Sequence, residues 1–574
     1  MKHNQASLLF CYAADDLAMT AINAAPVPTS CEPKGVVYTK EWVVDLLLDL
    51  AGYVPTANLV DPTAVEPSAG EGAFLGPMIG RLLASCKRLG RPIADCEHSI
   101  LAYELDEGSA TRARDFVFEL LAREGVERQL ANRLANCWVR CSDYLFGDWG
   151  LEADFVIGNP PYVRLEDMPN TNAAMYRQAY ATMRGRADLY VAFFEAALRQ
   201  LKQGGVCAFI CADRWMRNQY GAELRRLVTS GYSVDFLIEM HDAQPFEDEV
   251  DAYPAVTVIR RSRQGTTVVA TASPDMERAQ ASRPSGALLR LAGDRSTTLP
   301  TGLSAAVVNT WFKGSDPWPC RTPAQLELLR RLEEQFVPLE SEETQTRVGI
   351  GVATGHDQVF ITTDPSVVED SRLLKLALVE DIQSGKLKWS GHYLIDPWER
   401  DGLVDLQCFP KLADYFHQHA STIKKRNVAS KNPHAWFRTI DRVNHGLTNK
   451  PKLYIADIKN KLSPVLDRGE TYPHHNLYFV QSELWDLEVL GGLLLSQVAH
   501  FFVESYGVRM RGGYLRFQAQ YLRRIRVPQR SSITERHGCE LREAFRTRDK
   551  ARATRAALEV YRISATEMEQ ALEY

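Results

Sequence analysis

The sequence predicts an α/β fold in which a doubly wound, mostly parallel sheet is followed by a mixed α+β region and a helical tail. Short β-rich runs alternate with helical runs between residues 35 and 262, which is typical of such a sheet. From 304 to 534 aromatic residues and basic clusters become frequent. The last segment, 535–574, is rich in Ala, Arg and Glu, as expected for one or two amphipathic helices.

The helical runs lie at 41–52, 72–89 and 187–201. The β-rich runs lie at 99–103, 137–141, 154–157, 205–211, 234–239 and 256–260. Residues 1–34 carry no clear pattern and are interpreted as an N-terminal arm. Residues 263–303 are rich in Ser, Thr, Ala, Gly and Arg with little periodicity, so we predict a linker there. The expected domains are therefore 35–262 and 304–534, with a C-terminal helical segment at 535–574.

Length and composition restrict the protein class. A chain of 574 residues exceeds one ordinary core and suggests two or three domains. The net charge of −5 means that any nucleic-acid contact must come from local basic patches. The eleven cysteines are scattered, which favours reduced thiols in a cytoplasmic protein over a metal site. The apolar stretch 487–508 contains several polar residues, so we expect a buried helix and no membrane span.

A glycine-rich turn follows a short strand and precedes a helix. Its sequence is Glu66-Pro67-Ser68-Ala69-Gly70-Glu71-Gly72. Glycines let the backbone approach a ligand at the carboxyl edge of a sheet. Glu104 and Asp106 follow the next strand, where a carboxylate can bind both hydroxyls of a ribose. Each feature alone is also typical of a plain turn or a solvated strand end, but together they indicate a nucleotide-like ligand.

The residues after the strand at 154–157 carry the reaction chemistry. They are Gly158-Asn159-Pro160-Pro161-Tyr162. Two consecutive prolines can continue neither a ladder nor a helix, and they hold the loop extended. A carboxamide oxygen and a proline carbonyl can then accept both hydrogens of an NH2 group, while a tyrosine ring stacks on the base. Such acceptors aim the nitrogen lone pair at a methyl donor, so the loop predicts methyl transfer to an exocyclic amino group.

These motifs together resemble the gamma-ordered, TaqI-like adenine-N6 DNA methyltransferases of restriction–modification systems. That order places the motif for the methionine end of S-adenosylmethionine first, here Gly35-Val36-Val37-Tyr38-Thr39. The glycine turn and the Asn-Pro-Pro-Tyr loop follow, and the recognition domain comes last. Ser142-Asp143-Tyr144-Leu145 and Asp188-Leu189-Tyr190 match two further motifs. Lys40 stands where the family usually has proline, which is a departure from the pattern.

The resemblance implies a Rossmann-like methyltransferase domain and assigns its site residues. Those implied to hold S-adenosylmethionine are Tyr38, Thr39, Glu66, Ser68, Ala69, Gly70, Glu104, Asp143, Tyr144 and Asn159. Those implied to surround the adenine are Asn159, Pro160, Pro161, Tyr162 and Phe246. Because the amino group of a paired base cannot be reached inside a duplex, the adenine must be flipped out. No general base with a tuned pKa and no metal is required.

The second half resembles a TaqI-like C-terminal specificity domain. Residues 349–357 look like its start, and 436–437, 451–454, 476–478 and 512–517 continue its signatures in order. Residues 421–461 hold ten Lys or Arg against two Asp, and 507–530 hold seven Arg and no acid. Basic residues interleaved with aromatics suit contact with DNA phosphates. We expect such contacts from Arg509, Arg511, Arg516, Arg523, Arg524, Lys424 and Lys425.

Several alternatives stay open at this point. Asn-Pro-Pro-Tyr also occurs in enzymes that methylate protein glutamine or RNA, but those lack a long specificity domain. Cytosine-N4 transfer is disfavoured because Ser more often replaces Asn159, and cytosine-C5 transfer needs a Pro-Cys loop, whereas Pro319-Cys320 lies outside the catalytic half.

Two other classes of protein are also disfavoured. A fused nuclease would need more than the 34 residues before the first motif, and the intact Asn-Pro-Pro-Tyr loop argues against an inactive DNA-binding module. The sequence therefore predicts a cytoplasmic modification enzyme that acts on double-stranded DNA. A separately encoded restriction endonuclease is its potential partner.

Overall fold

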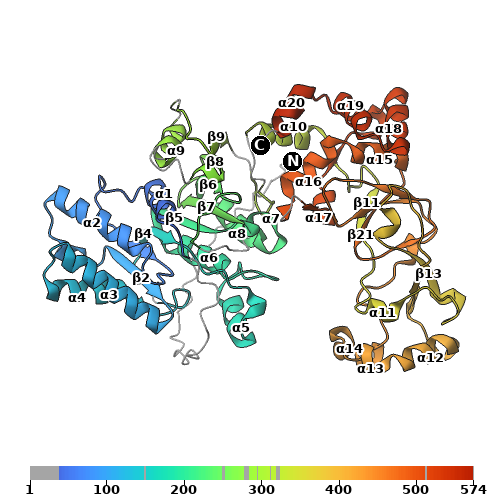
Figure 1. Cartoon of the computed structure of the whole chain (residues 1–574), viewed down its shortest axis with the longest axis horizontal. Helices are drawn as coiled ribbons and strands as arrows, with labels where there is room; N and C mark the ends of the chain where they lie inside the picture. The colour runs from blue at the N-terminus through green and yellow to red at the C-terminus, as the bar shows by residue number, and fades with distance from the viewer. Residues whose placement is uncertain are drawn as a thin grey trace, which may run out of the picture.

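The computed structural model has two lobes (Figure 1). The first lobe contains one large sheet with helices on both faces, and the second contains several small sheets with a helical end. The structure describes residues 38–147, 150–247, 253–276, 284–293, 295, 297–309, 312–318, 323–507, 509–510 and 514–572. The predicted N-terminal arm at 1–34, together with Gly35, Val36 and Val37 of the first motif, lies outside the described residues.

The large sheet has nine strands in the order β3-β2-β1-β4-β5-β7-β6-β8-β9. Strands β1 to β5 pair in parallel with their neighbours, whereas β7 is antiparallel to both β5 and β6. The chain thus winds in both directions from β1, and the predicted doubly wound sheet is confirmed. The strands are β1 (Ala64–Glu66), β2 (Ile100–Glu104), β3 (Val139–Cys141), β4 (Ala153–Gly158), β5 (Leu201–Ala212), β6 (Ser233–Glu239), β7 (Pro254–Arg260), β8 (Thr266–Ala272) and β9 (Leu303–Asn309).

The predicted linker at 263–303 is wrong. This segment holds β8, helix α9 (Pro284–Ala292) and the first residue of β9. β8 pairs in parallel with β6, and β9 pairs antiparallel with β8, so the sheet continues to Asn309. β9 is an edge strand whose residues are mostly half-buried. The strand that lies inside the predicted linker, β8, consists only of Thr, Val and Ala, and polar residues flank it, so the composition of the segment resembles that of a linker.

Helices cover both faces of the sheet. Val206, Ala208 and Ile210 of β5 lie in the core with helices α1 to α4, whereas Cys207 and Phe209 lie in the core with α6 and α8. This alternation is the two-residue period of a strand, and coverage on both faces explains why the inner strands are apolar throughout. The helices are α1 (Glu41–Ala51), α2 (Leu75–Leu89), α3 (Glu107–Arg123), α4 (Arg128–Trp138), α5 (Asn170–Ala179), α6 (Tyr190–Gln200), α7 (Arg214–Arg217) and α8 (Ala222–Gly231).

The second lobe is mixed α+β, as predicted. Its main antiparallel sheet has the order β11-β21-β17-β19, and a second sheet has the order β12-β14-β13-β20. These strands are β11 (Thr346–Ile350), β12 (Ile361–Thr362), β13 (Leu373–Ala377), β14 (Tyr393–Ile395), β17 (Lys452–Ala456), β19 (Val465–Asp467), β20 (Tyr472–Pro473) and β21 (Leu477–Ser482). A short hairpin joins β15 (Trp398–Glu399) to β16 (Gly402–Leu403), and α11 (Asp357–Phe360) follows β11.

The chain ends in helices that pack on α10 (Pro323–Gln335) and on the main sheet of this lobe. The tail holds three helices rather than one or two: α18 (Glu535–Thr547), α19 (Lys550–Tyr561) and α20 (Ala565–Leu572). The buried helix expected at 487–508 is a pair, α15 (Leu487–Leu495) and α16 (Gln497–Tyr506), which bends by 64°. No described helix is long and apolar enough by itself to cross a membrane, although this bent pair together has the necessary length and composition.

Candidate active site

The predicted site residues gather at one edge of the large sheet. β1 lies between β2 and β4, so the strands that follow β1 in the sequence extend the sheet first on one side (β2, β3) and then on the other (β4, β5). Glu66 and Glu104 are the last residues of β1 and β2, and Asn159 follows β4 directly. Because these strands are parallel, their carboxyl ends meet at the same edge. This point, where the strand order reverses, is where open α/β sheets bind ligands.

The turn after β1 is fixed by the carboxylate at the end of β2. The Glu104 carboxylate accepts hydrogen bonds from the backbone N–H groups of Gly70 (2.8 Å) and Asp106 (2.9 Å). Gly72 has a φ of +99°, and a Cβ at this position would lie 3.0 Å from the Phe116 ring. The turn therefore requires glycine at 72 for both its backbone conformation and its space.

Glu66 is a buried carboxylate that lacks a full set of partners. It is 1% exposed, and its Oε2 has no hydrogen-bond partner among the described residues. Burial, together with the nearby charge of Glu104, raises the pKa of Glu66 well above its ordinary value. An orphaned buried oxygen is costly unless a donor reaches it, so this position suits a ligand that carries N–H or O–H groups.

Hydrogen bonds join the loop after β4 to two distant segments. Ser68 donates its hydroxyl to the Asn159 carbonyl oxygen (2.9 Å), and the Asn159 side-chain amide donates to the Thr39 hydroxyl (3.1 Å). Thr39 in turn forms a single antiparallel bridge with Phe246. The structure thus brings together four segments that the sequence separates: the start of α1, the glycine turn, the Asn-Pro-Pro-Tyr loop and the loop after β6.

Two aromatic rings lie beside this loop. The ring centroids of Tyr162 and Phe246 are 6.0 Å apart with an interplanar angle of 81°. Phe246 is 5% exposed, and burial raises the pKa of the Tyr162 phenol well above its ordinary value. The Tyr162 hydroxyl is buried and has no hydrogen-bond partner in the described part of the chain. The pair offers aromatic surface close to the Asn159 loop.

The motif after β3 places one polar and one buried side chain. Asp143 accepts from the Leu145 N–H and from the Tyr176 hydroxyl, both at 2.9 Å, and burial raises the pKa of its carboxyl. Tyr144 is 2% exposed and donates its hydroxyl to Gln200 (2.9 Å). Its ring belongs to the core, so a ligand can meet this residue only through its backbone.

The chain resembles known proteins over most of its length. The model of the Eco57I restriction-modification methylase matches residues 131–246, and that of the TaqI-like C-terminal specificity domain matches 380–527. The Type II methyltransferase M.XhoI of Xanthomonas vasicola is 41% identical over 93% of this chain and 98% of its own. M.PaeR7I of Pseudomonas aeruginosa is 42% identical over 96% of this chain and 95% of its own. The chain belongs to the Type II methyltransferases of restriction–modification systems.

A solved structure shows the same fold at low sequence identity. The Type IIL restriction-modification enzyme MmeI, determined in complex with DNA, matches 92% of this methyltransferase and 73% of its own chain. The TM-score is 0.53 at 14% sequence identity. The two-lobed arrangement of a doubly wound sheet and a mixed second lobe is therefore shared with that enzyme.

Three of the seven predicted basic contacts already have partners within the methyltransferase. Arg516 pairs with Asp457 (2.7 Å) and Arg523 with Glu340 (2.9 Å). Arg524 is 25% exposed and lies over the Tyr506 ring, with its guanidinium carbon 4.3 Å from the centroid. These three arginines therefore support the packing of the second lobe.

The other predicted contacts differ in how much the structure shows of them. Lys424 and Lys425 are exposed, and the Lys424 ammonium lies 4.7 Å from the ring centroid of Trp436. Arg511 lies outside the described residues, and the side chain of Arg509 is not described.

Sequence reasoning missed a buried charged cluster at the same sheet edge. His241 Nε2 lies 3.0 Å from an Asp213 carboxylate oxygen, and Arg217 bridges Asp213 (3.1 Å) and Glu239. Burial lowers the pKa of His241, but the hydrogen bond and charge of Asp213 outweigh it, so the net shift is upward. Asp213 and His241 follow β5 and β6 closely, and polar residues at predicted strand ends were the available signal.

Proposed function

We propose that this methyltransferase uses S-adenosylmethionine to methylate N6 of an adenine flipped out of duplex DNA. The observation that carries the proposal is the position of the Asn159–Tyr162 loop. It is fixed by Thr39 and Ser68 and lies beside the Phe246 ring. The loop offers acceptors for an amino group and a ring for a base, within one rigid arrangement.

The residues at the sheet edge fit S-adenosylmethionine. The buried Glu66 oxygen that lacks a partner can accept from a ligand donor. Each Glu104 oxygen accepts one backbone N–H and keeps a further lone pair for a ribose hydroxyl. The Asp143 carboxyl can accept from an adenine amino group, and the Leu105 and Phe146 side chains are exposed apolar groups in the same part of the sequence. When bound, S-adenosylmethionine supplies an electrophilic methyl group on sulfur.

The protein contributes position rather than acid–base chemistry. The Asn159 carboxamide oxygen and the Pro160 carbonyl accept the two hydrogens of the base amino group, so its nitrogen lone pair points along the transfer direction. The Tyr162 ring stacks on one face of the base, and Phe246 limits its movement. Holding two reactants in line in this way can contribute about 7–11 kcal/mol to lowering a barrier. The nitrogen proton then leaves to solvent.

The two lobes have different roles in this proposal. We assign catalysis to the lobe that ends at Asn309 and DNA recognition to the lobe that begins at α10. The exposed Lys424 and Lys425 are suited to phosphate contact. A cytoplasmic location and a separately encoded restriction endonuclease are consistent with a modification enzyme.

Sequencing of modified bases in single DNA molecules tests the proposal. DNA is taken from a methylation-free bacterial host that expresses the wild type, Asn159→Ala or Tyr162→Ala, with Asn132→Ala on the exposed face of α4 as the matched control. We expect N6-methyladenine at one sequence motif with the wild type and the control, and a large loss with the two loop variants. Methylation on cytosine N4, or none with any protein, would overturn the proposal.

A further inference from the structure

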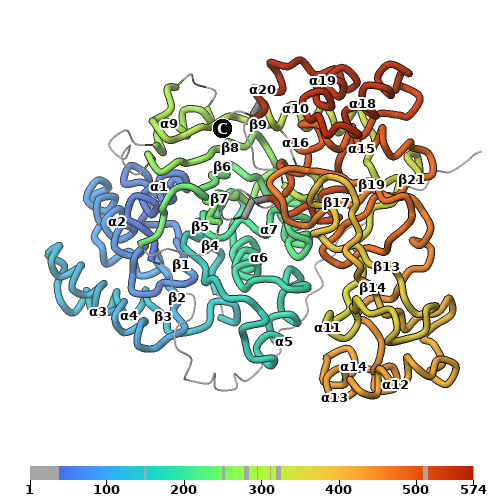
Figure 2. Tube along the Cα trace, turned by 45° about the vertical axis from the view of Figure 1, so that its right-hand side comes forward, coloured from blue at the N-terminus to red at the C-terminus, as the bar shows by residue number. Residues whose placement is uncertain are grey.

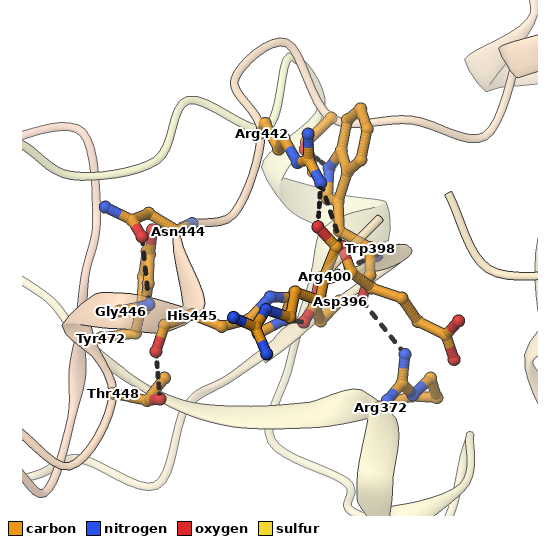
Figure 3. Close-up of polar contacts among 12 residues, drawn as sticks. Arg372, Asp396, Trp398, Arg400, Arg442, Asn444, His445, Gly446, Thr448 and Tyr472 are labelled. Carbon is orange, nitrogen blue, oxygen red and sulfur yellow. Dashed lines mark hydrogen bonds and ion pairs between the residues drawn. The ribbon is translucent and has the colours of Figure 1, made fainter. Parts of the chain in front are cut away.

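One tryptophan in the second lobe is held rigidly beside the surface. Trp398 is 7% exposed, and its indole N–H donates to the buried Thr439 hydroxyl (2.8 Å). Its backbone N–H donates to Asp396 (2.9 Å), and its carbonyl accepts from Arg372 (3.2 Å). Three directional contacts fix both the backbone and the ring plane, so Trp398 can act as a platform for other side chains (Figure 3).

Two arginines lie over this ring. The guanidinium carbons of Arg438 and Arg442 lie 5.2 Å and 5.6 Å from the Trp398 ring centroid. Arg442 also donates to the carbonyls of Glu399 (3.3 Å) and Arg400 (2.6 Å), and Figure 3 shows Arg442 beside Arg400. Stacking on an aromatic face and hydrogen bonds from one edge restrict a guanidinium, and its other donors stay available.

The loop that carries these arginines is itself fixed. The His445 imidazole lies 2.6 Å from the buried Asp396, and the Asn444 side chain accepts from the Gly446 N–H (3.0 Å). The Asp441 carboxylate accepts from the Ala353 N–H (2.9 Å), and the Asp441 backbone N–H donates to the Ala353 carbonyl (3.1 Å). The segment 438–446, here named the arginine loop, is therefore preorganised, and binding through it would lose little conformational freedom.

Among the described residues, the Arg438 and Arg442 side chains of the arginine loop are not paired with acids. In the part of the chain that the structure describes, no carboxylate lies within 4.0 Å of the Arg438 or Arg442 guanidinium. This contrasts with Arg516 and Arg523, which have acidic partners. Arg442 is exposed as well. The loop pairs with Ala353 and Thr354, just before α11, and α11 lies on the side of the second lobe that faces the first (Figures 1 and 2).

We propose that Arg438 and Arg442, held on Trp398, are specificity-determining residues that contact guanine edges in the major groove of the target duplex. This inference rests on the proposed function. A guanidinium offers donors only, and its fork matches the O6 and N7 acceptors of guanine. Phosphate contact needs charge more than a fixed orientation, and flexible lysines such as Lys424 and Lys425 supply it.

The test compares sequence motifs as well as amounts of methylation. The full-length wild type, Arg442→Ala, Arg442→Lys and Arg438→Ala are expressed in a methylation-free host, and N6-methyladenine is mapped by single-molecule sequencing. Arg555→Ala, at an exposed position of α19, is the matched control. We expect both Arg442 variants to keep methylating but to accept other bases at a position where the wild type requires guanine. Discrimination at that position should fall about 5- to 140-fold.

The lysine variant separates base contact from phosphate contact. Lysine keeps the charge but lacks the planar fork, so a phosphate-contacting residue would be rescued by Arg442→Lys and would leave the motif unchanged. An unchanged motif in all three variants, with or without weaker methylation, would overturn the inference. Thermal unfolding of each purified variant identifies misfolding, and a misfolded alanine variant leaves Arg442→Lys to decide. A wild type that leaves no modified base overturns the proposed function instead.

Discussion

Replacing Tyr162 with Phe separates the role of its hydroxyl from that of its ring. The hydroxyl is buried and has no hydrogen-bond partner among the described residues, and such a group costs about 1–3 kcal/mol. The ring lies 6.0 Å from Phe246 and is available to a base, and base–aromatic stacking contributes about 1–3 kcal/mol. Tyr162→Phe removes the penalty of the buried hydroxyl and keeps the stacking of the ring. We therefore expect unchanged or higher stability, by up to about 3 kcal/mol, with methylation retained.

Tyr162→Ala is the counterpart that removes the ring. The lost stacking predicts a fall in kcat/KM of about 5- to 140-fold. Urea unfolding gives the free energy of unfolding, and transfer of a radiolabelled methyl group to a duplex oligonucleotide gives kcat/KM. The reasoning is refuted if Tyr162→Phe loses as much activity as Tyr162→Ala, or if it lowers the free energy of unfolding by more than about 1 kcal/mol.

Three further predictions concern stability. Gly72→Ala should lower the free energy of unfolding by about 1 kcal/mol or more and weaken cofactor binding. Gly80→Ala, at an exposed position in the middle of α2, should instead raise the free energy of unfolding by about 0.5–1 kcal/mol. Calorimetry checks both, because the two variants should shift the Tm in opposite directions. Lys452→Met should lower the free energy of unfolding, measured with urea, by about 3–5 kcal/mol, because it leaves Asp467 without its partner in a fully buried ion pair (3.0 Å). A decrease of less than about 1 kcal/mol would contradict this prediction. The raised pKa of His241 predicts stabilisation that is complete below about pH 6.5 and is lost as pH rises through the folded pKa. The Tm difference between wild type and His241→Gln should therefore shrink as the pH is raised above about 6.5.

The proximity of the glycine turn to the Asn159 loop could be predicted, because each is a contiguous sequence motif. The glycine turn and the Asn159 loop each follow a strand within a few residues, so parallel pairing alone predicts that they meet. The Asp213–His241 contact could not be predicted in this way, because β7 lies between β5 and β6 and returns antiparallel. Long-range pairing also hid the state of Arg524, whose acidic neighbour Glu333 is distant in the sequence. A basic cluster in a sequence does not show which of its charges the fold has already neutralised.

That internal neutralisation has a thermodynamic consequence for how the enzyme would search DNA. Each phosphate neutralised by a free cation releases condensed counterions and steepens the fall of log K with log salt by about 0.9. Arg516 and Arg523 share their charge with carboxylates, so they add little to this release. The chain as a whole carries a charge of −5. Nonspecific binding to duplex DNA should therefore be weak and short-lived. The residence time at a target site should depend on specific contacts with the DNA rather than on counterion release.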